Sequence, residues 1–193
     1  MRFGRVMAEA ARYTRTAVAL HWLLAAAILA QIVLGWYLDE IPRGTPARSW
    51  WVNLHKSTGM TIGVLIAVRL TWRWSHPPPF LPESMPAWER VAADASHRLL
   101  YACMLMMPVT GYVASNFSKY GVKLFNAVLL PPWGPENTQV YALFKGTHVI
   151  TSYIFVALIA VHVISALRHL FQRDGVFQRM WPSVGPSRQA AEE

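Results

Sequence analysis

Four long apolar stretches constrain this chain of 193 residues more than any other feature. They cover about residues 17–38, 52–72, 97–116 and 141–167, and each reaches the roughly 20 residues with which a helix crosses the hydrocarbon core of a bilayer. Charged residues make up only 15% of the sequence, whereas soluble domains contain about 25%. The sequence therefore predicts an all-α fold, an integral membrane four-helix bundle, with residues 1–193 forming a single transmembrane domain.

The positive charges are distributed unevenly between the two sides of this expected bundle. Twelve of the 18 Lys and Arg residues lie on the side of both chain termini, and the Lys- and Arg-rich side of a membrane protein stays in the cytoplasm. Both termini are therefore expected to be cytoplasmic, and the net charge of +8 indicates topology rather than nucleic-acid binding. We expect 116–139 to be the longest outer loop and 182–193 to be a disordered tail. The cations of the outer side are Arg43, Arg48, Lys56, Lys119, Lys123 and Lys145.

Four histidines lie inside the expected spans, where ionisable residues are rare and usually functional. His148 and His162 are 14 residues apart, which is close to four helical turns and about 21 Å. Both therefore share one face of the last helix at two different depths. His21 in the first span matches the inner depth, and His55 in the second span matches the outer depth. The sequence thus predicts two pairs, His21 with His162 and His55 with His148.

Two opposed imidazoles at each depth suit a haem iron with both axial positions filled, which transfers single electrons and has no free site for oxygen. Zinc or copper transport is the main alternative for the same residues, but such metals usually require Cys, Met or carboxylate ligands. The expected spans contain no Asp or Glu, and Cys103 is the only cysteine. The pattern therefore predicts two b-type haems, each held between two histidines inside the bundle.

The residues around these histidines resemble those of the bacterial cytochrome b-561 family. The resemblance is carried by LHWL at 20–23, NLHKSTG at 53–59 and the spacing of the two histidines in the last span, and it covers about residues 10–180. The family also resembles the cytochrome b subunits of nickel hydrogenases and formate dehydrogenases. The resemblance implies a bacterial inner-membrane bundle with two haems and a quinone site. By motif position, its iron ligands are His21, His55, His148 and His162.

Other residues near the inner depth have candidate roles. Arg69 is expected either to pair with a haem propionate or to extend to the lipid headgroups. His169, two turns beyond the last iron ligand, is placed to hydrogen-bond a quinone headgroup or, alternatively, to face water. His97 is either a rival ligand, a residue lining the quinone pocket, or a packing residue, and His76 is expected in solvent.

These features predict an oxidoreductase. One activity known in the resembled family is oxidation of superoxide at the outer face with reduction of ubiquinone in the membrane, and the outer cations would attract an anionic donor. The alternatives are a subunit that couples a separate dehydrogenase or a periplasmic redox protein to the quinone pool, a non-enzymatic protein that binds haem or quinone, and a metal transporter. Lipid, quinone and superoxide or a periplasmic redox protein are the expected partners, and the oligomeric state is left open.

Overall fold

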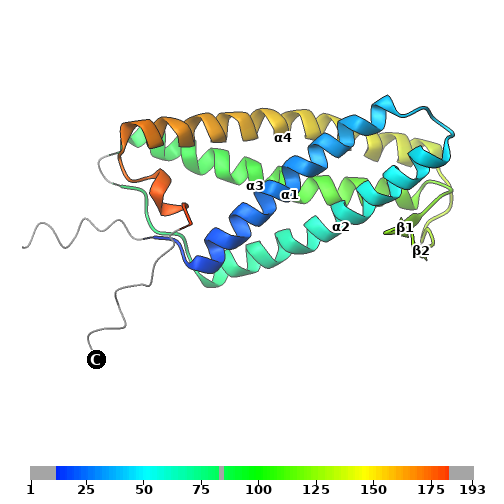
Figure 1. Ribbon diagram of the computed structural model, residues 1–193, viewed down its shortest axis with the longest axis horizontal. Coiled ribbons are helices and arrows are strands. Elements are labelled where there is room, and N and C mark those ends of the chain that lie inside the picture. Colours follow the sequence, from blue (N-terminus) through cyan, green and yellow to red (C-terminus); the bar gives the residue numbers. More distant parts are fainter. Residues whose placement is uncertain (1–11, 83–84, 183–193) are drawn as a thin grey trace, which may run out of the picture.

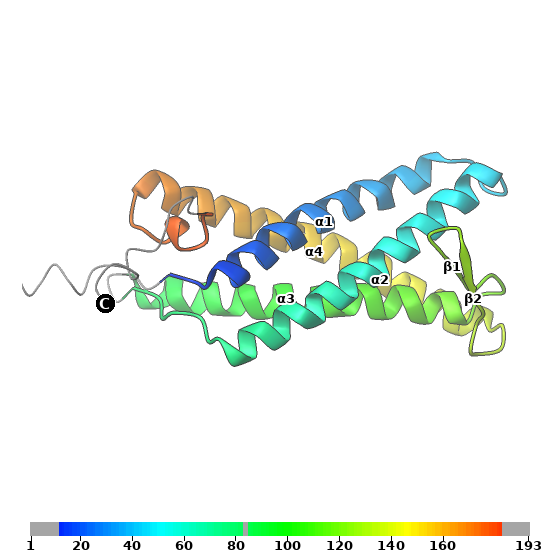
Figure 2. The same ribbon diagram turned by 60° about the horizontal axis from the view of Figure 1, so that its bottom comes forward.

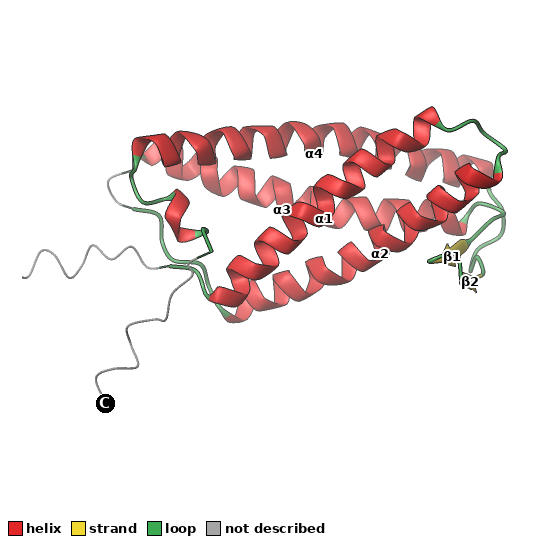
Figure 3. Cartoon of the chain, viewed as in Figure 1, coloured by secondary structure: helices red, strands yellow, loops and turns green. Residues whose placement is uncertain are grey.

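The computed structural model describes residues 12–82 and 85–182, and these residues form four long helices in up-and-down order (Figure 1). The helices are α1 (Arg15–Glu40), α2 (Pro46–Ser75), α3 (Ala87–Asn116) and α4 (Thr138–Gln172). A two-stranded antiparallel hairpin, β1 (Val122–Leu124) and β2 (Val128–Leu130), lies between α3 and α4, and a short 3-10 helix, η1 (Phe177–Arg179), follows α4. Helices dominate the structure, and the hairpin is confined to one end (Figure 3). We name the hairpin end the outer end and the opposite end, where α1 begins, the inner end.

The helices are long enough for a bilayer, and the expected membrane four-helix bundle is confirmed. Each expected span lies within one helix. Among the described helices, α1, α3 and α4 are both long and apolar enough to cross a membrane. α2 has 30 residues, about 45 Å, but it carries more polar side chains. α3 begins ten residues before its expected span, because its polar first turns continue the helix beyond the apolar segment.

Backbone packing leaves α4 apart from the first two helices. Close approach joins α1 to α2, α2 to α3 and α3 to α4, while α4 makes no comparable contact with α1 or α2 in the described residues. In Figure 2, α1 and α2 run side by side with a similar tilt, and this pair is inclined across α3 and α4. The small buried core of Leu24, Ile62 and Ile66 lies between α1 and α2, whereas many apolar side chains of all four helices are exposed, as lipid contact requires.

Side-chain caps define several helix ends. Thr14, Thr45 and Asn137 accept backbone N–H groups at the starts of α1, α2 and α4. At the end of α1, the guanidinium of Arg48 donates to the carbonyl oxygen of Ile41 at 2.6 Å, where a positive charge also complements the helix dipole. Arg48 is therefore a cap for α1, and not a free charge of the outer surface as the sequence had suggested.

The hairpin is a feature that the sequence analysis missed, since 116–139 was expected to be a loop. Its three-residue connection contains Phe125 and Asn126 at positive φ angles of 46° and 59°, a conformation that Asn tolerates better than most residues. The hairpin packs against α2 at the outer end. Short strands of this length are stabilised by such packing rather than by their own ladder.

Candidate functional site

The structure brings both expected histidine pairs together. At the outer end, the ring centres of His55 and His148 lie 6.3 Å apart. At the inner end, the ring centres of His21 and His162 lie 6.2 Å apart. One pair joins α2 to α4 and the other joins α1 to α4, which are the helices that do not pack closely. The two pairs therefore lie between α4 and the first two helices, at two depths of the bundle.

The ring separations fit two imidazoles on one metal. A metal bonded to one nitrogen of each ring at about 2 Å holds the ring centres about 6 Å apart. Among the described residues, no group of three or more His, Cys, Asp or Glu is placed to share a metal ion. Each pair thus offers two nitrogens, the number of axial positions that a porphyrin leaves open on its iron.

Glycines make room for the outer rings. A Cβ atom at Gly35 would lie 3.5 Å from Cε1 of His55, and one at Gly111 would lie 3.1 Å from Cε1 of His148. The second distance is shorter than ordinary van der Waals contact, so a larger residue there would displace the ring. The absence of side chains at Gly35 and Gly111 thus leaves space for the imidazole rings.

Hydrogen bonds orient one ring of the outer pair. Nδ1 of His148 lies 3.0 Å from the carbonyl oxygen of Met107 and 3.2 Å from the hydroxyl of Thr110. Because a carbonyl oxygen only accepts, the proton of His148 resides on Nδ1 and the lone pair on Nε2. This is the tautomer that metal-ligating histidines adopt. Nδ1 of His55 is buried and has no hydrogen-bond partner among the described residues.

A cation lies beside the inner pair. Arg69 places one guanidinium nitrogen 3.3 Å from Nδ1 of His21 and another 3.2 Å from the carbonyl oxygen of Ala17. The positive charge of Arg69 thus lies directly beside the ring of His21. Arg69 therefore lies beside the inner pair, and its pairing with a haem propionate stays a prediction.

A third histidine stands close to the inner pair. The ring centre of His97, on α3, lies 5.5 Å from that of His162. The sequence analysis had considered His97 as a rival of His162 for the ligand role, but the structure places His97 beside His162, where it would instead compete with His21 as the partner of His162. The free cysteine, Cys103, is buried farther along α3.

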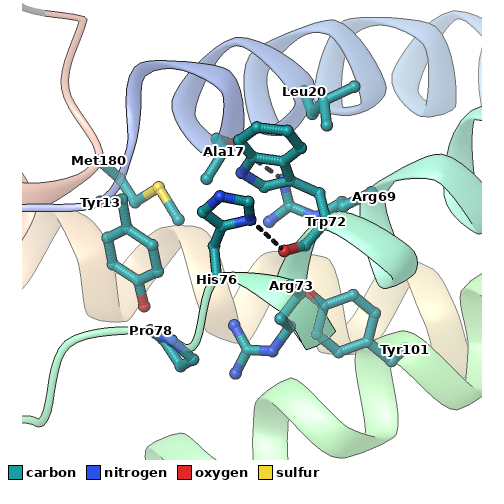
Figure 4. A pocket seen from close by; sticks show the side chains of 10 residues that line it. All are labelled: Tyr13, Ala17, Leu20, Arg69, Trp72, Arg73, His76, Pro78, Tyr101 and Met180. Atoms are coloured by element: carbon teal, nitrogen blue, oxygen red, sulfur yellow. Dashed lines mark hydrogen bonds between the residues drawn. The ribbon is translucent and has the colours of Figure 1, made fainter.

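A narrow pocket opens at the inner end between α1, α2 and α3 (Figure 4). Its volume of about 20 Å³ is close to that of one water molecule. Arg69 and Arg73 approach the ring of Tyr101, with their Cζ atoms 6.0 and 5.3 Å from its centre. His76 stacks on Trp72, with ring centres 4.0 Å apart, and is exposed, as expected.

A second, larger pocket surrounds His169. Its volume is about 280 Å³, and it lies between the ends of α3 and α4 that face the inner side. Nδ1 of His169 lies 2.5 Å from a carboxylate oxygen of Asp174, whose other oxygen accepts the N–H of Val176. Arg168, which also lines the pocket, pairs with Glu89 at 2.9 Å. The carboxylate orients the imidazole and leaves Nε2 as the ring nitrogen available to a ligand.

Asp174 and Arg168 are candidate functional residues that sequence reasoning missed. Two other arginines of the inner end are engaged elsewhere. Arg90 donates to the carbonyl oxygen of Met85, and Arg98 pairs with Asp94 on the surface. The signal available was an acidic residue directly after the last helix, followed by a glycine that permits a return turn.

The cations of the outer end differ in their roles, because some of them make structural hydrogen bonds. Lys56 donates to the carbonyl oxygen of Gly121 at 2.8 Å and thereby ties α2 to the hairpin segment. Ser57 accepts the N–H of Phe125 at 2.7 Å in the same contact. The two residues that directly follow His55 therefore bind the hairpin segment.

Comparisons with known proteins agree with these features. A family model described as Prokaryotic cytochrome b561 matches residues 12–183. Cytochrome b561 homolog 1 of Escherichia coli is 29% identical over 178 residues, which cover 89% of this chain and 97% of the relative. Cytochrome b561 homolog 2 of the same organism is 28% identical over 174 residues, or 88% of this chain and 90% of the relative. Cytochrome b562 of Cereibacter sphaeroides is 26% identical over 179 residues, or 90% and 98%. The chain therefore belongs to the prokaryotic cytochrome b561 family, membrane b-type cytochromes that bind haem and transfer electrons.

Proposed function

We propose that this protein transfers electrons from superoxide at its outer face to ubiquinone near its inner end, using two b-type haems. The observation that carries the proposal is the repetition of one geometry at two depths: two imidazoles with ring centres 6.2 Å apart at the inner end and 6.3 Å apart at the outer end. A single pair would serve one haem at one surface. Two pairs on one face of α4 provide a path through the bundle.

The ligand roles follow from the pairs. His55 and His148 would hold the outer haem, and His21 and His162 the inner one. When bound, haem iron with two axial imidazoles supplies reversible one-electron transfer without an open position for oxygen. Met107 and Thr110 hold the tautomer of His148, while Arg69 supplies positive charge beside His21, where a propionate can also reach it.

The pocket around His169 is the proposed quinone site. Reduction of ubiquinone to the quinol consumes two electrons and two protons, so the site needs a proton donor as well as an electron source. His169 can donate from Nε2 to a quinone carbonyl, and Asp174 can stabilise the positive charge of its imidazolium form. The volume of about 280 Å³ is near the lower limit of about 300 Å³ for ligand pockets, and the pocket is open on one side, where an isoprenoid tail can leave.

Charge supports superoxide as the donor at the outer end. Each of two superoxide anions loses one electron and leaves as dioxygen, and the two electrons with two protons convert one ubiquinone to ubiquinol. After Arg48 and Lys56 have been assigned to structural contacts, the cations that remain on the outer side are Arg43, Lys119, Lys123 and Lys145. Their field would attract a small anion. Electron transfer at a haem edge needs no bond between superoxide and iron.

We further propose that the chain is a single domain in the bacterial inner membrane with both termini in the cytoplasm. The basis is the excess of Lys and Arg on the side of the termini. In this orientation, quinone protons come from the cytoplasmic side and superoxide arrives from the periplasm.

One feature favours a second candidate function, the coupling of a periplasmic redox protein or dehydrogenase to the quinone pool. The hairpin region exposes Tyr120, Phe125, Leu129 and Trp133 at the outer end. Exposed aromatic and apolar side chains of this kind are typical of protein contacts. A protein donor would then replace superoxide at the same outer histidine pair.

A stopped-flow experiment separates the two candidates. Oxidised, purified protein is mixed with potassium superoxide, with and without ubiquinone, while haem absorbance is recorded. Superoxide–quinone activity requires rapid haem reduction that superoxide dismutase abolishes, followed by reoxidation when ubiquinone is present. Two haems that ignore superoxide but accept electrons from ubiquinol would reject the superoxide proposal in favour of the coupling role.

A further inference from the structure

Different partners face the inner and outer histidine pairs. At the inner pair, the guanidinium of Arg69 lies 3.3 Å from Nδ1 of His21. At the outer pair, Nδ1 of His148 lies 3.0 Å from the carbonyl oxygen of Met107. The inner ring therefore faces a positive charge, whereas the outer ring faces the negative end of a peptide dipole.

A second guanidinium adds to the positive charge at the inner end. Arg73 follows Arg69 by about one turn of α2, and both guanidiniums lie near the ring of Tyr101 (Figure 4). No Asp or Glu is among the described residues that line the pocket between them. The ion pairs of the described residues lie elsewhere: Arg98 with Asp94, Arg168 with Glu89 and His169 with Asp174. No carboxylate in these pairs neutralises either guanidinium.

The outer end offers a weaker counterpart. Lys56 follows His55 in sequence, but its ammonium is hydrogen-bonded to the carbonyl oxygen of Gly121 at 2.8 Å. Arg69 also donates to a backbone carbonyl oxygen, that of Ala17, so the contrast is one of number and contact. Two guanidiniums lie at the inner end, one of them 3.3 Å from a histidine ring, and one ammonium lies at the outer end. The inner pair lies in the more positive surroundings.

The surroundings of the inner pair and those of the outer pair would shift the reduction potential of a haem iron in opposite directions. Ferric iron carries one more positive charge than ferrous iron, so a neighbouring cation destabilises the ferric form and raises the reduction potential. A carbonyl that accepts the Nδ1 proton makes an imidazole more basic, which stabilises the ferric form and lowers the potential. Both effects are strengthened by the low dielectric of a membrane interior.

We propose that Arg69, supported by Arg73, holds the reduction potential of the haem between His21 and His162 above that of the haem between His55 and His148. The inference rests on the proposed function, because it requires a haem in each pair. An electron delivered at the outer end is then drawn toward the inner end, where ubiquinone is proposed to accept it. Arg69 is thus a residue that sets the direction of electron flow.

A redox titration of the full-length protein in lipid nanodiscs, followed by haem absorbance, tests the inference. The variants His55→Ala and His21→Ala, each expected to keep one haem, assign the two potentials to their sites. In Arg69→Gln, the ferrous-to-ferric ratio of the inner haem at a given poise should fall about tenfold, a shift of about 59 mV for one electron. The outer potential should stay constant, and Arg69→Lys should recover most of the shift. An inner potential that is unchanged or raised in Arg69→Gln overturns the inference.

Two further variants keep the test decisive. Arg98→Gln removes one guanidinium from the same end of the bundle at a side chain that is 79% exposed, so solvent screening should leave both potentials unchanged. Arg73→Gln should lower the inner potential less than Arg69→Gln does. If the Arg69→Gln variant no longer binds the inner haem, the Arg73→Gln variant becomes the test. The inference is then overturned if the reduction potential of the inner haem does not fall in Arg73→Gln. If the unsubstituted protein binds fewer than two haems, the proposed function itself is contradicted. If it binds two haems whose reduction potentials do not respond to these arginine substitutions, only the role of Arg69 is contradicted.

Discussion

The outer pair of His55 and His148 and the inner pair of His21 and His162 share a ring separation, 6.3 and 6.2 Å, but not their surroundings. The outer rings lie against glycines and backbone carbonyls beneath a hairpin that is bonded to α2. The inner rings lie among arginines and a further histidine, close to an open pocket.

The two pairs therefore share the geometry of their rings but differ in the groups that surround the rings, and these two features have different structural origins. The spacing of the histidines along α4 sets the two depths, and the distances of α1 and α2 from α4 set the ring separation, which is repeated at both depths. The surroundings are set by which loops and helix ends happen to meet at each end of the bundle, and they diverge. We conclude that the common geometry determines what the pairs can bind, while the surroundings determine electron entry, electron exit and proton supply.

Removal of one histidine of the outer pair should give the largest difference between the outer and the inner site. In His55→Ala the outer iron loses an axial ligand, so the haem content should fall from two to about one per chain, with the inner haem retained. The pyridine haemochrome absorbance per protein measures this ratio. His76→Ala, which alters an exposed histidine stacked on Trp72, is the control and should keep both haems. Two haems in His55→Ala would remove His55 from the ligand set.

The third histidine at the inner end sharpens the same test. His97 lies within 5.5 Å of the His162 ring centre, but the pairing proposed here assigns the iron to His21 and His162. His97→Ala should therefore keep two haems with unchanged low-spin spectra. Loss of one haem in His97→Ala with retention of two in His21→Ala would transfer the ligand role from α1 to α3.

The rate of ubiquinone reduction should depend on the pocket around His169 at the inner end. His169→Gln removes the proposed proton donor while both histidine pairs remain, so the rate of ubiquinone reduction should fall about a hundredfold. Asp174→Asn should have a smaller effect, about tenfold, because it only weakens the orientation of His169. Rates are measured by reoxidation of pre-reduced haem with ubiquinone, and haem content is the control. A quinone rate that matches the unmodified protein in His169→Gln would remove this pocket from the proposal.

The close contact between Gly111 and the His148 ring predicts that a substitution at this glycine weakens the binding of the outer haem, with a smaller effect than the loss of a ligand or of His169. In Gly111→Ala, the new Cβ would lie 3.1 Å from Cε1 of His148, so the ring or the helix must shift, at a cost of about 1–3 kcal/mol. The outer haem should be lost at a lower temperature on heating, while the inner haem is little affected. Gly146→Ala is the matched control, since a Cβ there meets no atom within 4 Å. Equal behaviour of the two variants would contradict the close fit.

The hairpin should give the smallest effect. Ser57→Ala removes the hydroxyl that accepts the Phe125 N–H at 2.7 Å, a loss of about 1 kcal/mol. Hydrogen exchange of the hairpin amides should accelerate severalfold while the haem content stays at two. Thr61→Ala removes a hydroxyl that bonds only within α2 and is the control. Unaltered exchange in Ser57→Ala would show that the hairpin does not depend on this contact.

Sequence reasoning was most successful where a single helix carries the information. The apolar lengths predicted the helices, and the spacing of His148 and His162 predicted two depths, because helix rise and periodicity are local properties. It failed where polar residues bind segments distant in the chain. Arg48 and Lys56 had been grouped as outer surface charges, but they bond to carbonyl oxygens of Ile41 and Gly121.

The sequence by itself determined that this chain forms four membrane-length helices with histidines at two depths, since hydrophobic length and helical pitch need no tertiary contact. Only the tertiary structure decided which group faces each ring. Met107 reaches His148 through the packing of α3 on α4, Arg69 reaches His21 through the packing of α2 on α1, and Asp174 reaches His169 through the turn after α4. Such contacts join residues that share no periodic pattern, so they depend on how helices cross and where turns return.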